Sequence, residues 1–180
     1  QVDVPELNGG FVAVTGGVYH SLGINYDGTF VAWGYNGNGQ CDVPEPNEGF
    51  VAVAGGYSHS LGLKSDGTIV AWGYNYFGQC DVPAPNEGFV AVAVGGSHSL
   101  DLKCVGTVVA LGYDFYRQCD VPEPNEGFVA VAGGGSQSLG LQSDGTVRDG
   151  GGGYYEQGDV PHQLYGAVVV CGGQLYHPRS

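Results

Sequence analysis

Residues 42–80, DVPEPNEGFVAVAGGYSHSLGLKSDGTIVAWGYNYFGQC, are the unit from which the chain is built. A fixed repeat of about 20–50 residues is typical of solenoids, propellers and arrays of small modules. The unit recurs every 39 residues without insertion or deletion, because Asp-Val-Pro begins at Asp3, Asp42, Asp81, Asp120 and Asp159. The repeat therefore decides the architecture before any single residue is considered.

Three segments of the unit have strand patterns. Phe50–Ala54 is apolar on both faces, which predicts a short strand buried between layers, with Phe50, Ala52 and Ala54 on the same face. His59–Lys64 alternates, so that His59, Leu61 and Leu63 share one face. Asp66-Gly67 predicts a hairpin turn, because glycine takes positive φ without steric cost, and Thr68–Gly73 is then the returning strand. A fourth, weaker strand is expected over Gln79–Val82, ending before Pro83.

Short antiparallel strands in a unit of this length, with no helical period, predict an all-β fold. We expect a β-propeller, or an open propeller segment, built from 39-residue blades: four full units plus a partial fifth. A β-solenoid is the alternative, but its coils are shorter and its strands parallel. The predicted organisation is a single repeat domain over 1–173, with units near 3–41, 42–80, 81–119, 120–158 and 159–173, followed by a tail over 174–180.

The later units depart from the pattern at particular positions. Leucine and then glycine take the place of Trp72, at Leu111 and Gly150. In the fourth unit Gln137 takes the place of His59. The hairpin of the fifth unit is missing, so closure of a ring is an open question.

The composition excludes several classes of protein. The net charge is −13, from 18 acidic and 5 basic residues, which argues against nucleic acid and against anionic membrane surfaces as partners. The 35 glycines follow no Gly-X-Y period, and 42% hydrophobic residues are too many for a disordered chain. A basic or neutral partner is compatible with this charge.

The cysteines do not predict disulfides or a metal site. Cys41, Cys80 and Cys119 occupy one repeat position, where neighbouring blades are about 10 Å apart, beyond disulfide reach. CxxC spacing is absent. We expect these three residues to be small buried hydrophobes. The chain begins at Gln1 and contains no Met, which suggests a processed or partial product, and an extracellular, secreted location is the expectation.

The repeated residues resemble a known family. Gly55-Gly56-x-x-His59-Ser60-Leu61-Gly62-Leu63, Asp66-Gly67-Thr68 and Ala71-Trp72-Gly73-x-Asn75-x-x-Gly78-Gln79 are similar to the regulator of chromosome condensation repeat. The short period and the Gln-Cys-Asp-Val-Pro bridge look more like the bacterial-type members, which include the propeller-type β-lactamase inhibitory proteins. This resemblance implies blades of antiparallel strands around a central channel, often seven, with function carried by loops on one face. This chain has fewer units.

Loops at one end of the expected blades vary among units, while those at the other end barely change. A constant scaffold with variable aromatic loops is typical of a binding surface, because Tyr and Phe supply contact area at little entropic cost. Aromatic residues that merely cap the blade ends are the alternative. The candidate partner-binding residues are Tyr19, Tyr35, Tyr57, Tyr74, Tyr76, Phe77, Tyr113, Phe115, Tyr116, Tyr154 and Tyr155.

No metal, cofactor or catalytic site is predicted. His20, His59 and His98 recur with the repeat, but Gln137 at the fourth position favours hydrogen bonding between blades over metal ligation. The aspartates and glutamates are explained as turn residues, because no D-x-D-x-D run exists for calcium. Ser60 beside His59 is not a catalytic dyad, because adjacent strand residues point to opposite faces.

We therefore expect a non-enzymatic propeller that binds another protein through its aromatic loops. Inhibition of a β-lactamase-like enzyme is a subtype implied only by the resemblance. A carbohydrate-binding, lectin-like propeller is an alternative, with tyrosines stacking on a sugar ring. A structural module that self-assembles into a homo-oligomer through open blade edges is another. Guanine-nucleotide exchange, the activity of the family's eukaryotic namesake, is a more distant one.

Overall fold

The computed structural model describes residues 9–151, which form four three-stranded antiparallel sheets. Each sheet is one blade, and its strands are hydrogen-bonded in chain order. Blade 1 is β1 (Phe11–Gly16), β2 (His20–Asn25) and β3 (Phe30–Gly34); blade 2 is β4 (Phe50–Gly55), β5 (His59–Lys64) and β6 (Ile69–Gly73). Blade 3 is β7 (Phe89–Val94), β8 (His98–Lys103) and β9 (Val108–Gly112); blade 4 is β10 (Phe128–Gly133), β11 (Gln137–Gln142) and β12 (Val147–Gly151).

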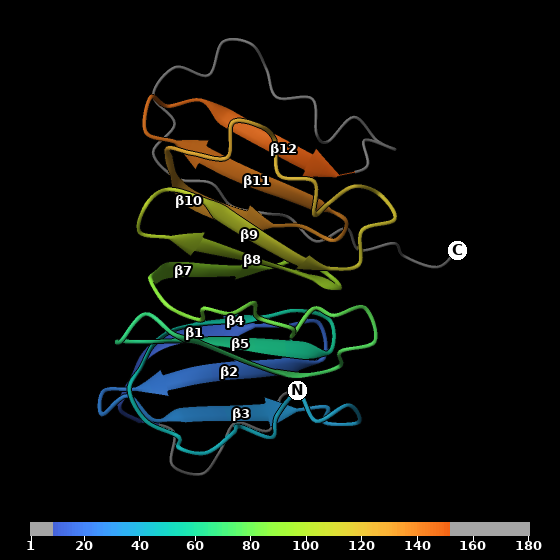
Figure 1. Ribbon diagram of the computed structural model, residues 1–180. Helices are drawn as coiled ribbons and strands as arrows, with labels where there is room; N and C mark the ends of the chain where they lie inside the picture. The colour runs from blue at the N-terminus through green and yellow to red at the C-terminus, as the bar shows by residue number, and fades with distance from the viewer. Residues whose placement is uncertain (1–8, 152–180) are drawn as a thin grey trace.

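The blades follow one another in chain order, from the blue sheet at the bottom of Figure 1 to the orange sheet at the top. The first strand of each of blades 2 to 4 (β4, β7 and β10) lies against both the first and the second strand of the preceding blade. Every strand pairing is antiparallel, which excludes the parallel solenoid for these residues. The fold is thus the predicted all-β partial propeller.

The hydrophobic core is divided among the junctions between blades. Between blades 1 and 2, Leu22, Ile24 and Phe30 pack against Phe50 and Trp72. The next two junctions repeat this arrangement around Leu61 and Phe89 and around Leu100 and Phe128. Each fully buried side chain of this size contributes about 2 kcal/mol, so packing between neighbours stabilises the stack.

The first strand of each blade differs from its predicted pattern. A β-bulge between Phe50 and Ala52 shifts the register against β5. As a result Phe50 and Val53 pack into the junction with blade 1, whereas Ala52 packs into the junction with blade 3. The prediction that Phe50 and Ala52 share a face was wrong, and Val51 at the bulge is 56% exposed rather than buried.

The fourth strand expected over Gln79–Val82 does not form. The backbone amides of this segment are used locally: the amide of Asp81 donates to Gly78 O at 3.1 Å and that of Val82 to Cys80 O at 3.0 Å. A segment whose amides bond within tight turns has none left for a strand ladder. Its one apolar side chain, Val82, still packs against the junction core.

An asparagine side chain fastens each connection to the outer strand of the preceding blade. The Asn47 amide accepts a hydrogen bond from Phe30 N at 2.7 Å and donates one to Phe30 O at 2.9 Å. Asn86 and Asn125 bond Ile69 and Val108 in the same way. This pairing covers backbone groups at the sheet edge.

No helix among residues 9–151 is long and apolar enough to cross a membrane. The predicted fifth unit over 159–173, the tail over 174–180 and the candidates Tyr154 and Tyr155 lie outside the described residues.

Candidate functional site

The two loop sets predicted to lie together do meet at one end of the blades. The loop between the first and second strands contacts the loop after the third through one backbone bond per blade, from Tyr35 N to Tyr19 O at 2.8 Å in blade 1. Tyr74 N and Tyr113 N bond Ser58 O and Ser97 O at 2.8 and 2.9 Å in blades 2 and 3. The Asp-Gly hairpins meet the Asn-Glu-Gly turns at the opposite end, where Ser65 N bonds Gly49 O at 2.9 Å.

A buried glutamine holds the loop after the third strand in each of blades 1 to 3. Its side-chain carbonyl accepts a hydrogen bond from the backbone amide at the loop tip: Gln40 from Asn38, Gln79 from Phe77 and Gln118 from Tyr116, at 2.9, 3.0 and 3.0 Å. We call this contact the glutamine clamp. It uses only backbone atoms of the tip residue, so it fixes the loop whatever side chain the tip carries.

The aromatic candidates of blades 2 and 3 form one continuous cluster, the aromatic ladder. Tyr74 contacts Tyr76 and Phe77, with ring centroids 6.3 and 6.1 Å apart. The Phe77 ring bridges to Tyr113 of the next blade at 4.7 Å. The ladder continues from Tyr113 to Phe115 and Tyr116.

The ladder presents a large apolar surface to solvent. Tyr76 and Phe115, at the loop tips, are 80% and 76% exposed, and Phe77 and Tyr116 are also exposed. Tyr76 and Phe115 contact neighbouring rings but are not packed into a core. The structure thus brings together Tyr74, Tyr76, Phe77, Tyr113, Phe115 and Tyr116.

The other aromatic candidates within residues 9–151 lie outside the ladder. Tyr19 and Tyr35 pair edge-to-face at 6.1 Å and, with Asn38 and Ser58, line a groove beside blade 1. The Tyr57 ring lies against Gly96 of the next blade, where an added Cβ would come within 3.1 Å of it. Glycine at this position leaves room for the ring.

The three repeated histidines are hydrogen-bonded between blades, as predicted. The Nε2 atoms of His20, His59 and His98 lie 2.9, 3.1 and 3.0 Å from the hydroxyls of Ser60, Ser99 and Ser138 in the next blade. Each serine hydroxyl donates its single proton to the backbone carbonyl oxygen of a glutamine, which is Gln40, Gln79 or Gln118. The serine oxygen therefore accepts from the ring, which assigns the Nε2–H tautomer to all three histidines.

These histidines are fully buried, and burial lowers the pKa of His20 and His98 to about 4 and that of His59 to about 3. They are therefore neutral at pH 7 and serve the junctions. Within residues 9–151 no group of three or more His, Cys, Asp or Glu side chains is arranged to hold a metal ion.

The cysteine prediction was correct about pairing but not about burial. Cys41, Cys80 and Cys119 are unpaired and half-buried, each with its sulfur 3.5–3.6 Å from the carbonyl oxygen of a tyrosine. They follow the buried glutamine in a turn near the surface, where full burial is not available. Burial raises the pKa of the Cys80 and Cys119 thiols to about 12, which makes them poor nucleophiles.

Sequence reasoning missed one buried acidic residue, Asp101 in the middle of β8. It takes the place of Gly62 of blade 2, and its side chain points toward that blade, on the same face as Ser99. Asp101 is 0% exposed, and neither carboxylate oxygen has a hydrogen-bond partner among residues 9–151. Burial raises its pKa to about 7. The sequence does contain a signal for this residue, because the other three units have glycine at the equivalent position.

The loop after the third strand of blade 3 has an aspartate, Asp114, where the loops of blades 1 and 2 have an asparagine. The side-chain amides of Asn36 and Asn75 each donate to an aspartate, Asp42 or Asp81, at 2.7 Å. Asp114 replaces this asparagine, and its carboxylate cannot donate to Asp120. Asp114 keeps only the other bond of the motif, from Cys119 N at 2.8 Å.

Replacing Asp114 by asparagine is therefore expected to stabilise the protein by about 1 kcal/mol, because it restores the bond to Asp120 and removes a like-charge contact. Urea unfolding of the two proteins at pH 7 measures the difference. Asp144→Asn is the matched control: the asparagine oxygen can still accept the turn bond from Thr146 N, 2.8 Å away, but the bond loses its charge, so this variant should not be stabilised. An Asp114→Asn variant no more stable than the parent would contradict this account.

Among family models, that of the regulator of chromosome condensation (RCC1) repeat matches this sequence at residues 11–40 and 50–79. These two units match the regulator of chromosome condensation repeat. They coincide with blades 1 and 2 and their following loops, so the resemblance seen in the repeated residues is confirmed. No curated protein matches the sequence significantly.

Several solved structures resemble this chain in fold. Prp20p from Saccharomyces cerevisiae has a TM-score of 0.68 and 21% identity over 78% of this chain and 45% of its own. Human WBSCR16 has 0.66 and 22%, over 78% and 47%. The CRINKLY WD40 ectodomain of the Arabidopsis thaliana receptor kinase ACR4 has 0.67 and 21%, over 91% and 56%. The chain spans about half the length of these proteins, and the likeness concerns the fold alone.

Proposed function

We propose that this chain is a non-enzymatic binding module that captures another protein through the aromatic ladder. The observation that carries the proposal is the run of contacting, exposed rings across blades 2 and 3. Tyr and Phe dominate the energetically important positions of interfaces, since they bury much area with few rotatable bonds. A monomeric surface seldom exposes such a patch without a partner.

The construction of the loops supports a preorganised surface. The glutamine clamp fixes the tips at Phe77 and Tyr116, and the Phe77–Tyr113 contact ties the two blades together. Little conformational entropy would then be lost on binding. The net charge of −13 favours a partner with a basic contact surface, which it would attract over long range.

Proteins of similar structure give further support to a protein-binding function. A structure of Prp20p is described together with its binding properties to Gsp1p and histones, and another shows Kap60 bound to yeast RCC1 (Prp20). Propellers of this repeat type can therefore serve as protein-binding scaffolds. Enzyme inhibition is a narrower form of the proposal, which a β-lactamase assay would test. Carbohydrate binding is the alternative to it, which a glycan array would test.

The test is a quadruple alanine variant at Tyr76, Phe77, Phe115 and Tyr116, compared with the parent protein as immobilised bait. Proteins that the parent retains should be lost, with an affinity decrease of at least about 30-fold, because hot-spot truncations cost about 2 kcal/mol or more each. Circular dichroism should be unchanged, since these residues lie outside the strands.

Tyr26→Ala is the matched control for this experiment. Tyr26 is 83% exposed, but it lies at the hairpin end of blade 1, opposite the ladder. Its replacement should leave capture intact. Full retention of the partner by the quadruple variant would refute the proposal, as would equal loss in Tyr26→Ala.

A further inference from the structure

A groove of about 580 Å³ opens among the loops of blades 1 and 2. It is lined by Tyr19 from the loop between β1 and β2, by Tyr35 and Asn38 from the loop after β3, and by Ser58 from the loop between β4 and β5. None of the six residues of the aromatic ladder lines it. Small-molecule sites in proteins typically have volumes of about 300–1,000 Å³, so the groove is large enough to be a separate binding site.

Two substitutions distinguish blade 1 from blade 2 at this place. Asn38 occupies the repeat position of Phe77. The Phe77 ring reaches Tyr113 of the following blade at 4.7 Å, whereas Asn38 has no ring with which to reach across to blade 2. Tyr19 occupies a position at which the other units have serine, namely Ser58, Ser97 and Ser136. Blade 1 therefore lacks the bridging ring of its neighbour and has an additional tyrosine in the groove.

The two tyrosine rings form a corner of the groove. Their planes meet at 72°, and their centroids are 6.1 Å apart. Gly37 makes room for Tyr35, because a Cβ at this position would collide with the Tyr35 hydroxyl. Tyr19 and Tyr35 are 51% and 56% exposed, so about half of each side chain remains accessible to a ligand.

The polar groups of the groove are neutral, and each can both donate and accept hydrogen bonds. They are the two phenol hydroxyls, the Ser58 hydroxyl and the Asn38 amide. The glutamine clamp uses only the backbone amide of Asn38, so the side-chain amide takes no part in that bond. Among the described residues no charged side chain lines the groove, so an ionised ligand would find no counter-ion there. Such groups match the hydroxyls of a sugar, and a flat aromatic ring matches the apolar C–H face of a pyranose.

We propose that the groove binds a neutral saccharide, as a second site separate from the aromatic ladder. One pyranose ring packs against a tyrosine ring, and its hydroxyls bond the Asn38 amide and the Ser58 hydroxyl. The net charge of −13 disfavours acidic sugars, because the protein repels them. The inference does not depend on the proposed protein-binding function, since the two sites share no residue.

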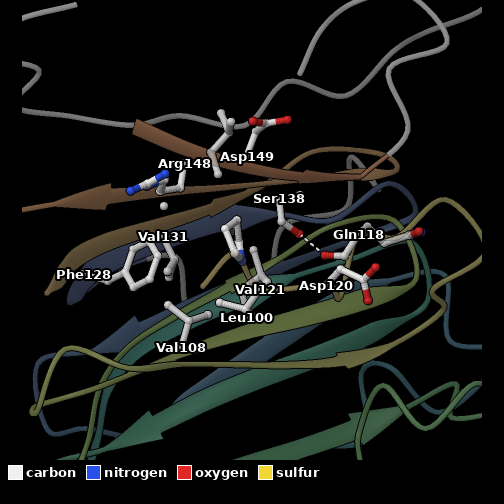
Figure 2. A pocket seen from close by; sticks show the side chains of 14 residues that line it. Leu100, Val108, Gln118, Asp120, Val121, Phe128, Val131, Ser138, Arg148 and Asp149 are labelled. Atoms are coloured by element: carbon white, nitrogen blue, oxygen red, sulfur yellow. Dashed lines mark hydrogen bonds between the residues drawn. The ribbon is translucent and has the colours of Figure 1, made fainter. Parts of the chain in front are cut away.

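The pocket in the junction between blades 3 and 4 is not a comparable site. Figure 2 shows Leu100, Val108 and Phe128 on its apolar side. It lies beside Gly150, which occupies the repeat position of Trp72. Its volume is only about 20 Å³, which is room for about one water molecule. A sugar ring therefore cannot enter it.

Isothermal titration calorimetry of the whole chain with cellotriose, triacetylchitotriose and maltotriose tests this inference. At least one of these neutral sugars should bind saturably, with one site per chain. Sorbitol carries hydroxyl groups but has no ring face, and it should not bind at the same concentrations. Absence of saturable binding for all three sugars, or equal binding of sorbitol, would overturn the proposal.

Variants of blade 1 locate the site. Asn38→Phe should fill the groove and abolish sugar binding; it should also fold, because blade 2 has phenylalanine at this position and the clamp bonds only the backbone. Tyr35→Ala should weaken binding about 10-fold, because the sugar loses a packing surface. Tyr26→Ala, at the hairpin end of the same blade, is the control and should bind as the parent does. Undiminished binding in Asn38→Phe would place the sugar elsewhere and refute the assignment.

The quadruple alanine variant of the ladder separates this site from the proposed protein interface. It should lose the protein partner and bind sugar unchanged, whereas Asn38→Phe should show the reverse. Sugar binding that is lost in the quadruple variant but kept in Asn38→Phe would contradict the proposal. Proline-rich peptides also bind aromatic-lined grooves, so binding of a decaproline peptide without binding of any of the three sugars would contradict it as well.

Discussion

Replacing Asp101 by asparagine is expected to stabilise the protein by about 4 kcal/mol at pH 8 and to change its stability little at pH 4. Burial without a hydrogen-bond partner raises the pKa of Asp101 from 3.8 to about 7. Between these values the folded state holds a proton that the unfolded state has released. Stability therefore falls as the pH rises from 3.8 through 7, by about 1.4 kcal/mol for each unit.

The surroundings of Asp101 offer no compensating charge. On its own face of β8 lie Ser99 and Lys103, and the Lys103 amine lies 4.7 Å from the centre of the Phe89 ring. The facing strand of blade 2 contributes His59, which is neutral at pH 7 because burial lowers its pKa to about 3. The remaining neighbours in this junction are apolar, including Val92 and Val109.

Urea unfolding at pH 4, 6 and 8 measures the Asp101 effect. Glu87→Gln is the control, because Glu87 is exposed and its replacement removes the same charge at the surface. The stabilisation should grow with pH in Asp101→Asn and stay flat in Glu87→Gln. A constant difference between Asp101→Asn and the parent at all three pH values would show that the carboxyl is not the titrating group.

Acidification is expected to destabilise the protein through His20, His59 and His98. Their pKa values in the folded state are about 4, 3 and 4, whereas a histidine in the unfolded chain titrates near 6.5. The unfolded state therefore takes up more protons as the pH falls below 6.5. At pH 5 each histidine costs about 2 kcal/mol and the three together about 6, comparable with the whole stability of a small domain.

His59→Gln tests this acid effect. Glutamine occupies the same repeat position at Gln137, and its amide can donate to Ser99 without titrating. The variant should lose about 2 kcal/mol less than its parent between pH 8 and pH 5. Both are best measured in the Asp101→Asn background, because Asp101 regains about 3 kcal/mol over the same range. An unchanged pH dependence would exclude His59 as a contributor.

The repeat made the blades predictable. Asp66-Gly67 between two strand patterns predicted the hairpin, and the alternation of His59–Lys64 predicted which residues face each neighbour. The His–Ser bonds across junctions follow from that alternation, because His59 and Ser60 point to opposite blades. Local patterns and one period were sufficient for these features.

The errors arose where non-local geometry overrides a local pattern. A bulge after Phe50 reverses the facing of the residues that follow, and nothing in FVAVA marks it. The Gln79–Val82 segment has strand-like residues, but turns use its amides. The aromatic ladder could be predicted as a set of residues, while the Phe77–Tyr113 contact between blades depends on how the blades stack.

The pocket and Asp101 share one origin, since both appear where a unit departs from its neighbours. Gly150 in place of Trp72 and Asp101 in place of Gly62 were visible in the sequence as substitutions. Their consequences were not, because a lost ring or an added carboxyl acquires meaning only from the neighbouring blade that it faces.

The glutamine clamp has a consequence for how such a scaffold can change. The buried amide of Gln40, Gln79 or Gln118 holds a backbone atom at each tip, and the tip side chains contribute nothing to that bond. The energetic cost of exchanging a tip residue is therefore separated from the cost of folding the blade. Substitutions at residues 37–38, 76–77 and 115–116, by natural selection or by randomisation, could therefore change the binding specificity while the strands and junctions of the blades are retained.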